Sequence, residues 1–194
     1  SGVARYYKDC VKTLLDEIEL TGKFLREENF KISSLYIGGG TPSTLIEKDL
    51  EDVLKAVNTH IDMSDVREFT FEAGREDTLT DEKLEIAKKY GVDRISLNPQ
   101  TLRKVNRKFD RENFEKYFKK AKELGFIVNM DIIVGLPDET TEDILYTLGE
   151  LEKFDIENLT IHTLAFKRAS NLFKESQDRV ELDGKTITEA IKRL

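Results

Sequence analysis

Apolar residues recur along the chain with two spacings that alternate from the start to about residue 166. Short apolar runs predict strands, and longer segments with an apolar residue every three or four positions predict amphipathic helices. The expected strands are 35–37, 67–73, 93–98, 126–134 and 157–166. The expected helices are about 5–28, 46–60, a helix that Thr80 caps, about 111–124, and a helix that starts at TTED, 140–143, with capping-box-like spacing.

This alternation predicts an α/β fold with a parallel sheet of about five strands, either doubly wound or curved into a barrel. The connections are short, and no linker or internal repeat interrupts them. A length of 194 residues suits one domain. Ligands of such folds bind at the carboxyl ends of the strands, so we expect functional residues there.

The first expected strand runs into three consecutive glycines, Gly38 to Gly40, followed by Thr41 and Pro42. Three glycines lose more backbone entropy on folding than a turn requires, which indicates that a ligand approaches the backbone closely. No lysine and hydroxyl pair follows them as in a P-loop, and the spacing is not that of GxGxxG. A phosphate-binding loop is therefore disfavoured.

Other strands carry polar residues at or near their ends. Asp131 interrupts an apolar strand, where a carboxylate is costly unless it meets a partner or a ligand. Glu72 and Gln100 are residue types that hold ribose hydroxyls, although each could instead satisfy a loop backbone. His162 alone favours a structural role, and Gly135 with its neighbours fits either an ordinary turn or a ligand contact.

Composition narrows the classes of function. A formal net charge of −7 disfavours nucleic-acid binding, and no apolar run approaches the roughly 20 residues of a membrane span. The single cysteine, Cys10, excludes an internal disulfide and a multi-thiolate metal site within the chain, so we assign no metal ligand. It lies on the apolar stripe of the first helix, where we expect a core residue. Cysteine usage and the lack of a signal peptide favour a cytoplasmic protein.

Five motifs together resemble the radical S-adenosylmethionine (SAM) enzymes of the oxygen-independent coproporphyrinogen III oxidase type, most closely the coproporphyrinogen dehydrogenase branch. They are GGGTPS at 38–43, FEAGRED at 71–77, GVDRISLNPQT at 91–101, NMDIIVGLPDET at 129–140 and LTIHTLAFKRAS at 159–170. The likeness covers about residues 6–175. It implies a partial (β/α)6 TIM-like barrel that binds SAM and a [4Fe–4S] cluster at the carboxyl ends of its strands.

The resemblance also implies which residues bind SAM. The matching positions are Gly39, Gly40, Thr41, Glu72, Gln100, Arg107, Asp131 and Gly135. In the family the glycine motif receives the methionine end of SAM, the glutamate and glutamine are expected at the ribose, and the backbone at the Gly135 position supports the adenine. Arg107 is the best match for an arginine that pairs with the SAM carboxylate. The interval from Gln100 to Arg107 is about five residues shorter than expected. No catalytic residue is assigned.

The cluster-binding CxxxCxxC of the family is absent from this sequence. In the family this loop follows the first barrel strand. We therefore expect this chain to be a fragment of a longer enzyme, without the first strand and the cysteine loop. We expect residues 1–175 to form the barrel core, 176–194 to begin a truncated connector or substrate region, and this chain alone to be inactive.

For the parent protein the resemblance implies an enzyme of haem biosynthesis. SAM would be cleaved reductively to a 5′-deoxyadenosyl radical, which abstracts hydrogen from a propionate of coproporphyrinogen III. Loss of carbon dioxide and an electron would leave a vinyl group. The small-molecule porphyrinogen is the expected partner, and the electron donor and acceptor stay unassigned. Two alternatives stay open: a related radical SAM protein with another role, such as a haem chaperone, or a non-catalytic nucleoside-binding barrel.

Overall fold

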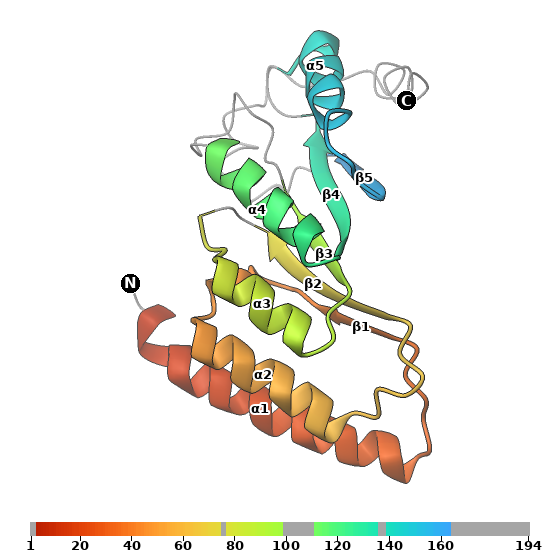
Figure 1. Ribbon diagram of the computed structural model, residues 1–194. Helices are drawn as coiled ribbons and strands as arrows, with labels where there is room; N and C mark the ends of the chain where they lie inside the picture. The colour runs from red at the N-terminus through yellow and green to blue at the C-terminus, as the bar shows by residue number, and fades with distance from the viewer. Residues whose placement is uncertain (1–2, 75–76, 99–110, 136–138, 164–194) are drawn as a thin grey trace. The chain divides into compact units, whose positions relative to one another are not determined.

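The computed structural model describes residues 3–74, 77–98, 111–135 and 139–163 (Figure 1). Its strands are β1 (Ser34–Ile37), β2 (Glu68–Gly74), β3 (Arg94–Leu97), β4 (Ile127–Val134) and β5 (Asn158–Thr163). Its helices are α1 (Val3–Glu27), α2 (Glu47–His60), α3 (Asp81–Lys89), α4 (Arg111–Glu123) and α5 (Thr141–Leu151), with a short 3-10 helix η1 (Pro42–Thr44). The five strands form one parallel sheet in sequence order, which confirms the predicted α/β fold.

The chain divides into two compact units. The first contains β1 to β3, α1 to α4 and the start of β4, and the second contains the rest of β4 together with α5 and β5. Each unit is described by itself below.

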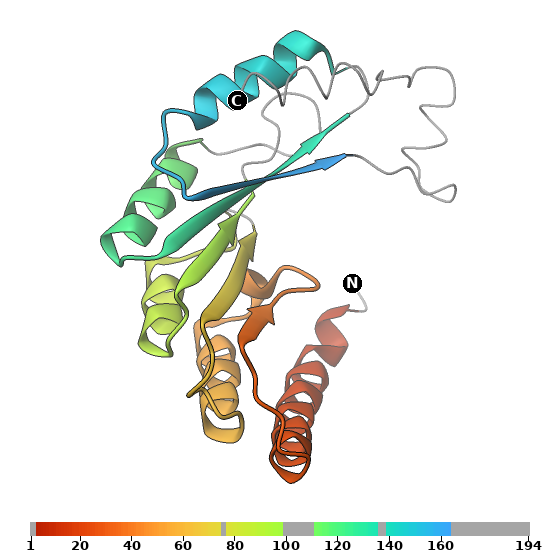
Figure 2. The same ribbon diagram turned by 90° about the vertical axis from the view of Figure 1, so that its right-hand side faces the viewer.

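The core of the first unit lies on one side of β2 and β3. Because side chains alternate along a strand, Phe69, Phe71 and Ala73 share one face of β2, and all three are at most 2% exposed. Ile95 and Leu97 share one face of β3 and are at most 4% exposed. Figure 2 shows α2 and α3 on this side of the strands. Burying each large side chain contributes about 1.5–3 kcal/mol.

The other face of the same strands is polar. Thr70 lies opposite Arg94 and Glu72 opposite Ser96 in the parallel register. Arg94 forms an ion pair of 3.0 Å with Glu68, which also accepts a hydrogen bond from the hydroxyl of Thr70 at 3.0 Å. No described helix of this unit covers that face (Figure 2). This face is polar but not open throughout, because Thr70 and Ser96 are only 2% and 3% exposed.

Helix α1 packs along α2 through a narrow line of residues. A Cβ added to Gly22 would lie 2.3 Å from the carbonyl oxygen of His60 at the end of α2, so the two helices approach closely here. Arg26 donates a hydrogen bond to the same carbonyl. The prediction that Cys10 is a core residue is wrong, because its side chain is exposed. Leu14, Leu20 and Phe24 of α1 are also exposed, so packing against α2 covers only part of the apolar side chains of this helix.

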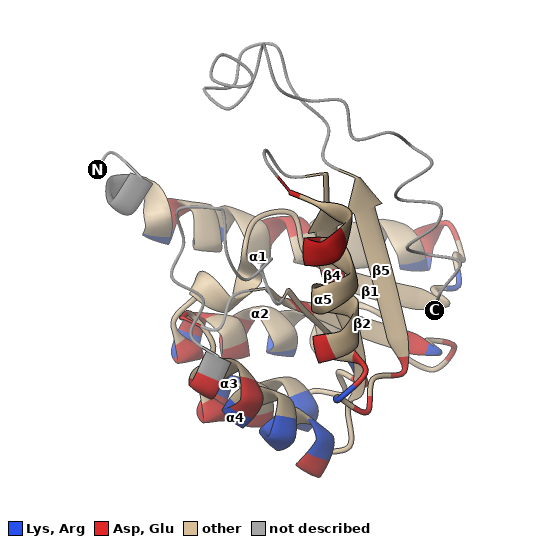
Figure 3. Cartoon of the chain, turned by 90° about the horizontal axis from the view of Figure 1, so that it is seen from above, with Lys and Arg blue, Asp and Glu red and all other residues tan. Residues whose placement is uncertain are grey.

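Charged residues of both signs are frequent along α3 and α4 (Figure 3). Opposite charges pair there, as in the contacts of Lys120 with Glu85 at 2.6 Å and of Lys116 with Asp81 at 3.3 Å. Such exposed pairs contribute about 0–1 kcal/mol each. Among the described residues, no helix is both long enough and apolar enough to span a membrane.

The second unit packs α5 near β4 and β5. Met130, Ile132 and Val134 alternate on the buried face of β4, each at most 3% exposed. The predicted capping box at the start of α5 is confirmed, since the Thr140 hydroxyl accepts from the Asp143 backbone N–H and the Asp143 carboxylate accepts from the Thr140 N–H. The hydroxyl of Thr140 satisfies an amide at the helix end that would otherwise lack a partner.

Candidate functional site

The three glycines after β1 differ in what they require. Gly39 has a φ of 102°, a conformation that residues with a side chain rarely adopt. Gly40 has no positive φ, and among the described residues no heavy atom would lie within 4 Å of a Cβ on either glycine. A Cβ on Gly38 would lie 2.3 Å from a ring carbon of Tyr36 and 2.6 Å from Oε2 of Glu72. The backbone of Gly39 and Gly40 thus borders open space, and Gly38 makes room for a carboxylate.

The end of β2 is irregular where it meets this loop. The register between β2 and β3 shifts between Glu72 and Gly74, and Gly74 has a φ of 57°. A Cβ on Gly74 would lie 3.0 Å from the methyl carbon of Thr41. Bulges and left-handed residues of this kind are common beside functional sites, where they redirect a side chain. The loop after β1 therefore meets the end of β2.

We call residues 38–41, Glu72 and Gly74 the glycine seat. It offers backbone groups that no described side chain shields, next to a partly buried carboxylate. An ionised carboxylate only accepts hydrogen bonds, so the seat suits a ligand with ammonium or hydroxyl groups. Phosphate fits poorly because Glu72 would repel it. The structure thus brings together four of the predicted site residues: Gly39, Gly40, Thr41 and Glu72.

Two further predicted residues, Asp131 and Gly135, belong to the second unit. Oδ1 of Asp131 accepts a hydrogen bond of 2.7 Å from the Asn129 amide and lies 3.9 Å from Nε2 of His162 on β5. The side chain of Asp131 is 20% exposed and that of His162 is 58% exposed. The carboxylate in the apolar strand therefore has a partner and keeps one side open.

The backbone N–H of Gly135 donates to the carboxylate of Glu139 at 2.6 Å, and Gly135 has a φ of 88°. This N–H is thus already bonded, which sequence reasoning did not anticipate. Gln100 and Arg107 lie outside the described residues. Their roles, like those of the other site residues, stay predictions.

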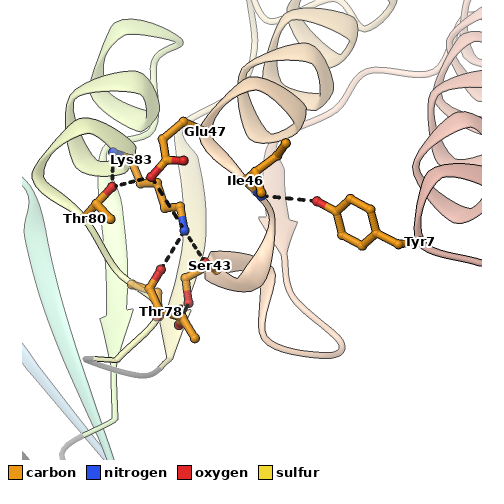
Figure 4. Close-up of polar contacts among 8 residues, drawn as sticks. Tyr7, Ser43, Ile46, Glu47, Thr78, Thr80 and Lys83 are labelled. Carbon is orange, nitrogen blue, oxygen red and sulfur yellow. Dashed lines mark hydrogen bonds and ion pairs between the residues drawn. The ribbon is translucent and has the colours of Figure 1, made fainter. Parts of the chain in front are cut away.

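A buried polar cluster around Lys83, Ser43 and Thr78 was not predicted from the sequence (Figure 4). Lys83 of α3 is 7% exposed, and its ammonium donates to the carbonyl oxygens of Ser43 at 2.8 Å and Thr78 at 2.7 Å. Lys83 lies four residues before Ala87 and beside Leu84 in the buried stripe of α3. A lysine at an apolar stripe position was the sequence feature that could have revealed it.

The start of α2 is tied to this cluster and to α1. Glu47 accepts a hydrogen bond of 3.0 Å from the Thr80 hydroxyl. Its own backbone N–H, that hydroxyl and the nearby Lys83 hold the pKa of Glu47 below its ordinary value. The hydroxyl of Tyr7 accepts a hydrogen bond of 3.2 Å from the Ile46 N–H, and burial raises the pKa of Tyr7. Helix α1 is thereby linked to the loop that follows the glycine seat.

The sequence model of the radical SAM superfamily matches residues 3–151 of this chain. The chain belongs to the radical SAM superfamily. The match includes the whole glycine seat, Asp131 and Gly135.

Curated relatives of this radical SAM chain fall into two groups. The oxygen-independent coproporphyrinogen-III oxidase-like protein HemZ of Bacillus subtilis is 40% identical over 163 residues, which are 80% of this chain and 32% of the relative. The heme chaperone HemW of B. subtilis is 32% identical over 140 residues, 69% of this chain and 37% of that protein. The chain thus spans about a third of the length of these relatives.

Among solved structures, the coproporphyrinogen III oxidase HemN of Escherichia coli, described as a radical SAM enzyme, matches with a TM-score of 0.79 at 23% identity. The match covers 97% of this chain and 46% of HemN. An archaeal Elp3 from Methanocaldococcus infernus matches with a TM-score of 0.60 at 16% identity, over 84% of this chain and 45% of that one. At these identities the likeness shows the fold alone, and it confirms the predicted TIM-like architecture.

The residues of this chain fit SAM but not the iron–sulfur cluster of the superfamily. The glycine seat combines an open backbone with a hydrogen-bond-accepting carboxylate, as an amino acid or ribose end requires. A cluster needs several thiolates, whereas Cys10 is the chain's single cysteine and lies exposed on α1. Among the described residues, no group of three or more His, Cys, Asp or Glu could hold a metal ion.

Proposed function

We propose that this chain forms the SAM-binding part of a radical SAM enzyme related to the oxygen-independent coproporphyrinogen III oxidases. One observation carries the proposal. No described atom lies within 4 Å of the position that a Cβ would take on Gly39 or Gly40, and the adjoining Gly38 leaves room for the carboxylate of Glu72. A phosphate site would need a positive group where the Glu72 carboxylate lies. The ammonium group of an amino acid or the hydroxyls of a nucleoside can bind that carboxylate.

Each part of the glycine seat is then proposed to contact a different part of SAM. The backbone at Gly39 and Gly40 receives the methionine end of SAM, with Thr41 closing the loop beside it. Glu72 accepts hydrogen bonds from ligand hydroxyl or ammonium groups, a contact worth about 1.5–3 kcal/mol when one partner is charged. In radical SAM enzymes, SAM supplies the hydrogen-abstracting chemistry. This chain's residues bind and orient the ligand, which is the usual part of a protein in cofactor chemistry.

The remaining predicted residues are each proposed to contact SAM. Asp131 is proposed to use its exposed side for SAM, Gly135 to support the adenine through backbone atoms other than its bonded N–H, and Gln100 and Arg107 to contact the ribose and the carboxylate. For the whole protein we propose oxidative decarboxylation of coproporphyrinogen III propionates to vinyl groups, in the cytoplasm. The oxidase-like relative with 40% identity supports this substrate.

A second candidate function is haem transfer. It is favoured by the heme chaperones among the relatives, which include the HemW protein of Lactococcus lactis at 35% identity over 162 residues. That match covers 77% of this chain and 42% of the chaperone. Both functions use the same radical SAM core, so the glycine seat serves either.

SAM titration of the chain by calorimetry tests the seat. Glu72→Gln keeps the shape of the side chain and removes its charge, so we expect SAM affinity to fall about 10- to 100-fold, the equivalent of one charge-assisted hydrogen bond. The matched control is Glu85→Gln on the exposed side of α3, which should bind SAM as the wild type does. Equal affinity of the Glu72 variant and the wild type would contradict the assignment.

The substrate is tested on the complete protein with its cluster reconstituted and oxygen excluded. An oxidase converts coproporphyrinogen III to a product that has lost two molecules of carbon dioxide. A chaperone leaves the porphyrinogen unchanged and transfers bound haem to an acceptor protein. The first outcome supports the proposed reaction, and the second replaces it with the alternative.

A further inference from the structure

Lys83 of α3 joins two separate loops near the glycine seat. Its ammonium bonds the Ser43 carbonyl, in the η1 segment that follows the glycines, and the Thr78 carbonyl, in the turn between β2 and α3. Oε1 of Glu47 lies 4.0 Å away and supplies a counter-charge. The side chain of Lys83 is 9% exposed, so water competes little with these contacts.

A second layer of hydrogen bonds joins the same two loops. The hydroxyl of Ser43, whose side chain is fully buried, donates to the Ala73 carbonyl at 2.7 Å. Its oxygen also lies 2.6 Å from the hydroxyl oxygen of Thr78. Because the single proton of Ser43 is already donated, Thr78 must be the donor in this contact. Two hydroxyls and one ammonium thus hold η1 against the end of β2.

The position of this cluster relates it to the glycine seat. Ala73 lies between Glu72 and Gly74 in sequence, and Ser43 follows Thr41 by two residues. Figure 4 shows the Lys83 side chain reaching from α3 to these two loops. The contacts therefore hold both halves of the seat, the loop with the open backbone and the strand end with the carboxylate.

A buried ammonium is costly, and a leucine or methionine would fill the same stripe position of α3 without that cost. An apolar side chain would leave the two carbonyls of Ser43 and Thr78 without their donor. A lysine supplies the donors for both carbonyls, and its charge is balanced by the Glu47 carboxylate 4.0 Å away.

We propose that Lys83 is a positioning residue for the ligand of the glycine seat. It fixes the loop after β1 relative to the end of β2, so that the Glu72 carboxylate and the Gly39–Gly40 backbone face a ligand in one arrangement. Lys83 does not contact the ligand. The identity of that ligand as SAM rests on the proposed function, whereas the fixing of the two loops does not.

The test compares Lys83→Met with the wild type in two measurements. Methionine keeps much of the length and removes the charge and donors. The first measurement, without ligand, is hydrogen exchange of the Thr44 and Leu45 amides, which bond the Thr41 and Pro42 carbonyls inside η1. We expect their exchange to accelerate at least tenfold, with the central amides of α2 as the internal reference for global opening.

The second measurement is SAM affinity, which we expect to fall about tenfold in Lys83→Met. The matched control is Lys88→Met, which removes a lysine of the same helix whose ammonium bonds the Gly125 carbonyl at 3.0 Å, away from the seat. It should change neither η1 exchange nor SAM affinity.

The outcomes separate the two proposals. Unchanged η1 exchange, or acceleration shared equally by the α2 amides, overturns the local role of Lys83. Accelerated η1 exchange with unchanged SAM affinity overturns its positioning role. If the wild type binds no SAM, the proposed function fails, and the exchange measurement still decides whether Lys83 fixes the two loops.

Discussion

The glycine seat makes opposite predictions for two adjacent glycines. Gly40→Ala adds a methyl group to open space at a residue without a positive φ. Such a change stabilises a protein by about 0.4–1 kcal/mol, because alanine restricts the unfolded chain more than glycine does. Gly39→Ala places the same group at a φ of 102°, where the strain costs about 1–3 kcal/mol. Stability should therefore rise slightly in the first variant and fall in the second.

Ligand binding should fall in both variants for different reasons. In Gly40→Ala the fold is intact, and the new methyl group occupies space that the ligand needs against the backbone. We expect SAM affinity to fall at least tenfold, which corresponds to a loss of about 1.4 kcal/mol. In Gly39→Ala the loop conformation itself is disturbed.

Urea unfolding and calorimetric SAM titration on the same samples measure the two effects. The informative variant is Gly40→Ala, because its stability and its affinity should change in opposite directions. If Gly40→Ala binds SAM like the wild type, close approach of the ligand to this backbone is refuted. If it unfolds more easily, the open space at Gly40 is refuted.

Four other substitutions test the surrounding structure. Gly22→Ala should destabilise the chain by about 1–3 kcal/mol, because its methyl group would overlap the His60 carbonyl. Gly149→Ala, where no described atom is near on α5, should be neutral or stabilise the chain by up to about 1 kcal/mol. Urea unfolding measures both changes, and a stabilising Gly22→Ala would contradict the α1–α2 contact. Tyr7→Phe should cost about 1 kcal/mol by leaving an amide at the start of α2 without its acceptor, and an unchanged urea midpoint would argue against that bond. Folding lowers the pKa of Glu47, so its contribution to folding stability is complete above the unfolded-state pKa and is lost as pH falls through the lower folded-state pKa. Glu47→Gln should therefore weaken the loss of stability in acid. Identical curves of unfolding free energy against pH for the variant and the wild type would count against this.

The order and type of the elements could be predicted because each has a clear period. The alternation of REFTFEA predicts β2, and the capping residues Thr80 and Thr140 mark the starts of α3 and α5, as the structure confirms. The exposure of Cys10 could not be predicted, because a stripe on a helix indicates an apolar face but not how much of it a neighbour covers.

The candidate site was predictable where backbone conformation demanded unusual residues. The three glycines and Glu72 were identified from sequence, and the structure places them together. The burial of Lys83 could have been predicted from its position in the apolar stripe of α3, but its acceptors could not, because they are main-chain carbonyls of distant loops. Hydrogen bonds from side chains to distant backbone follow only from the fold.

The most direct test of the SAM site is a titration of the ¹⁵N-labelled chain with SAM, followed by amide chemical shifts, which also report weak binding. We predict shift changes concentrated at residues 38–41 and 72–74, with α1 and the exposed face of α4 unaffected. Shift changes confined to other elements, or none at saturating SAM, would contradict the assignment of the glycine seat.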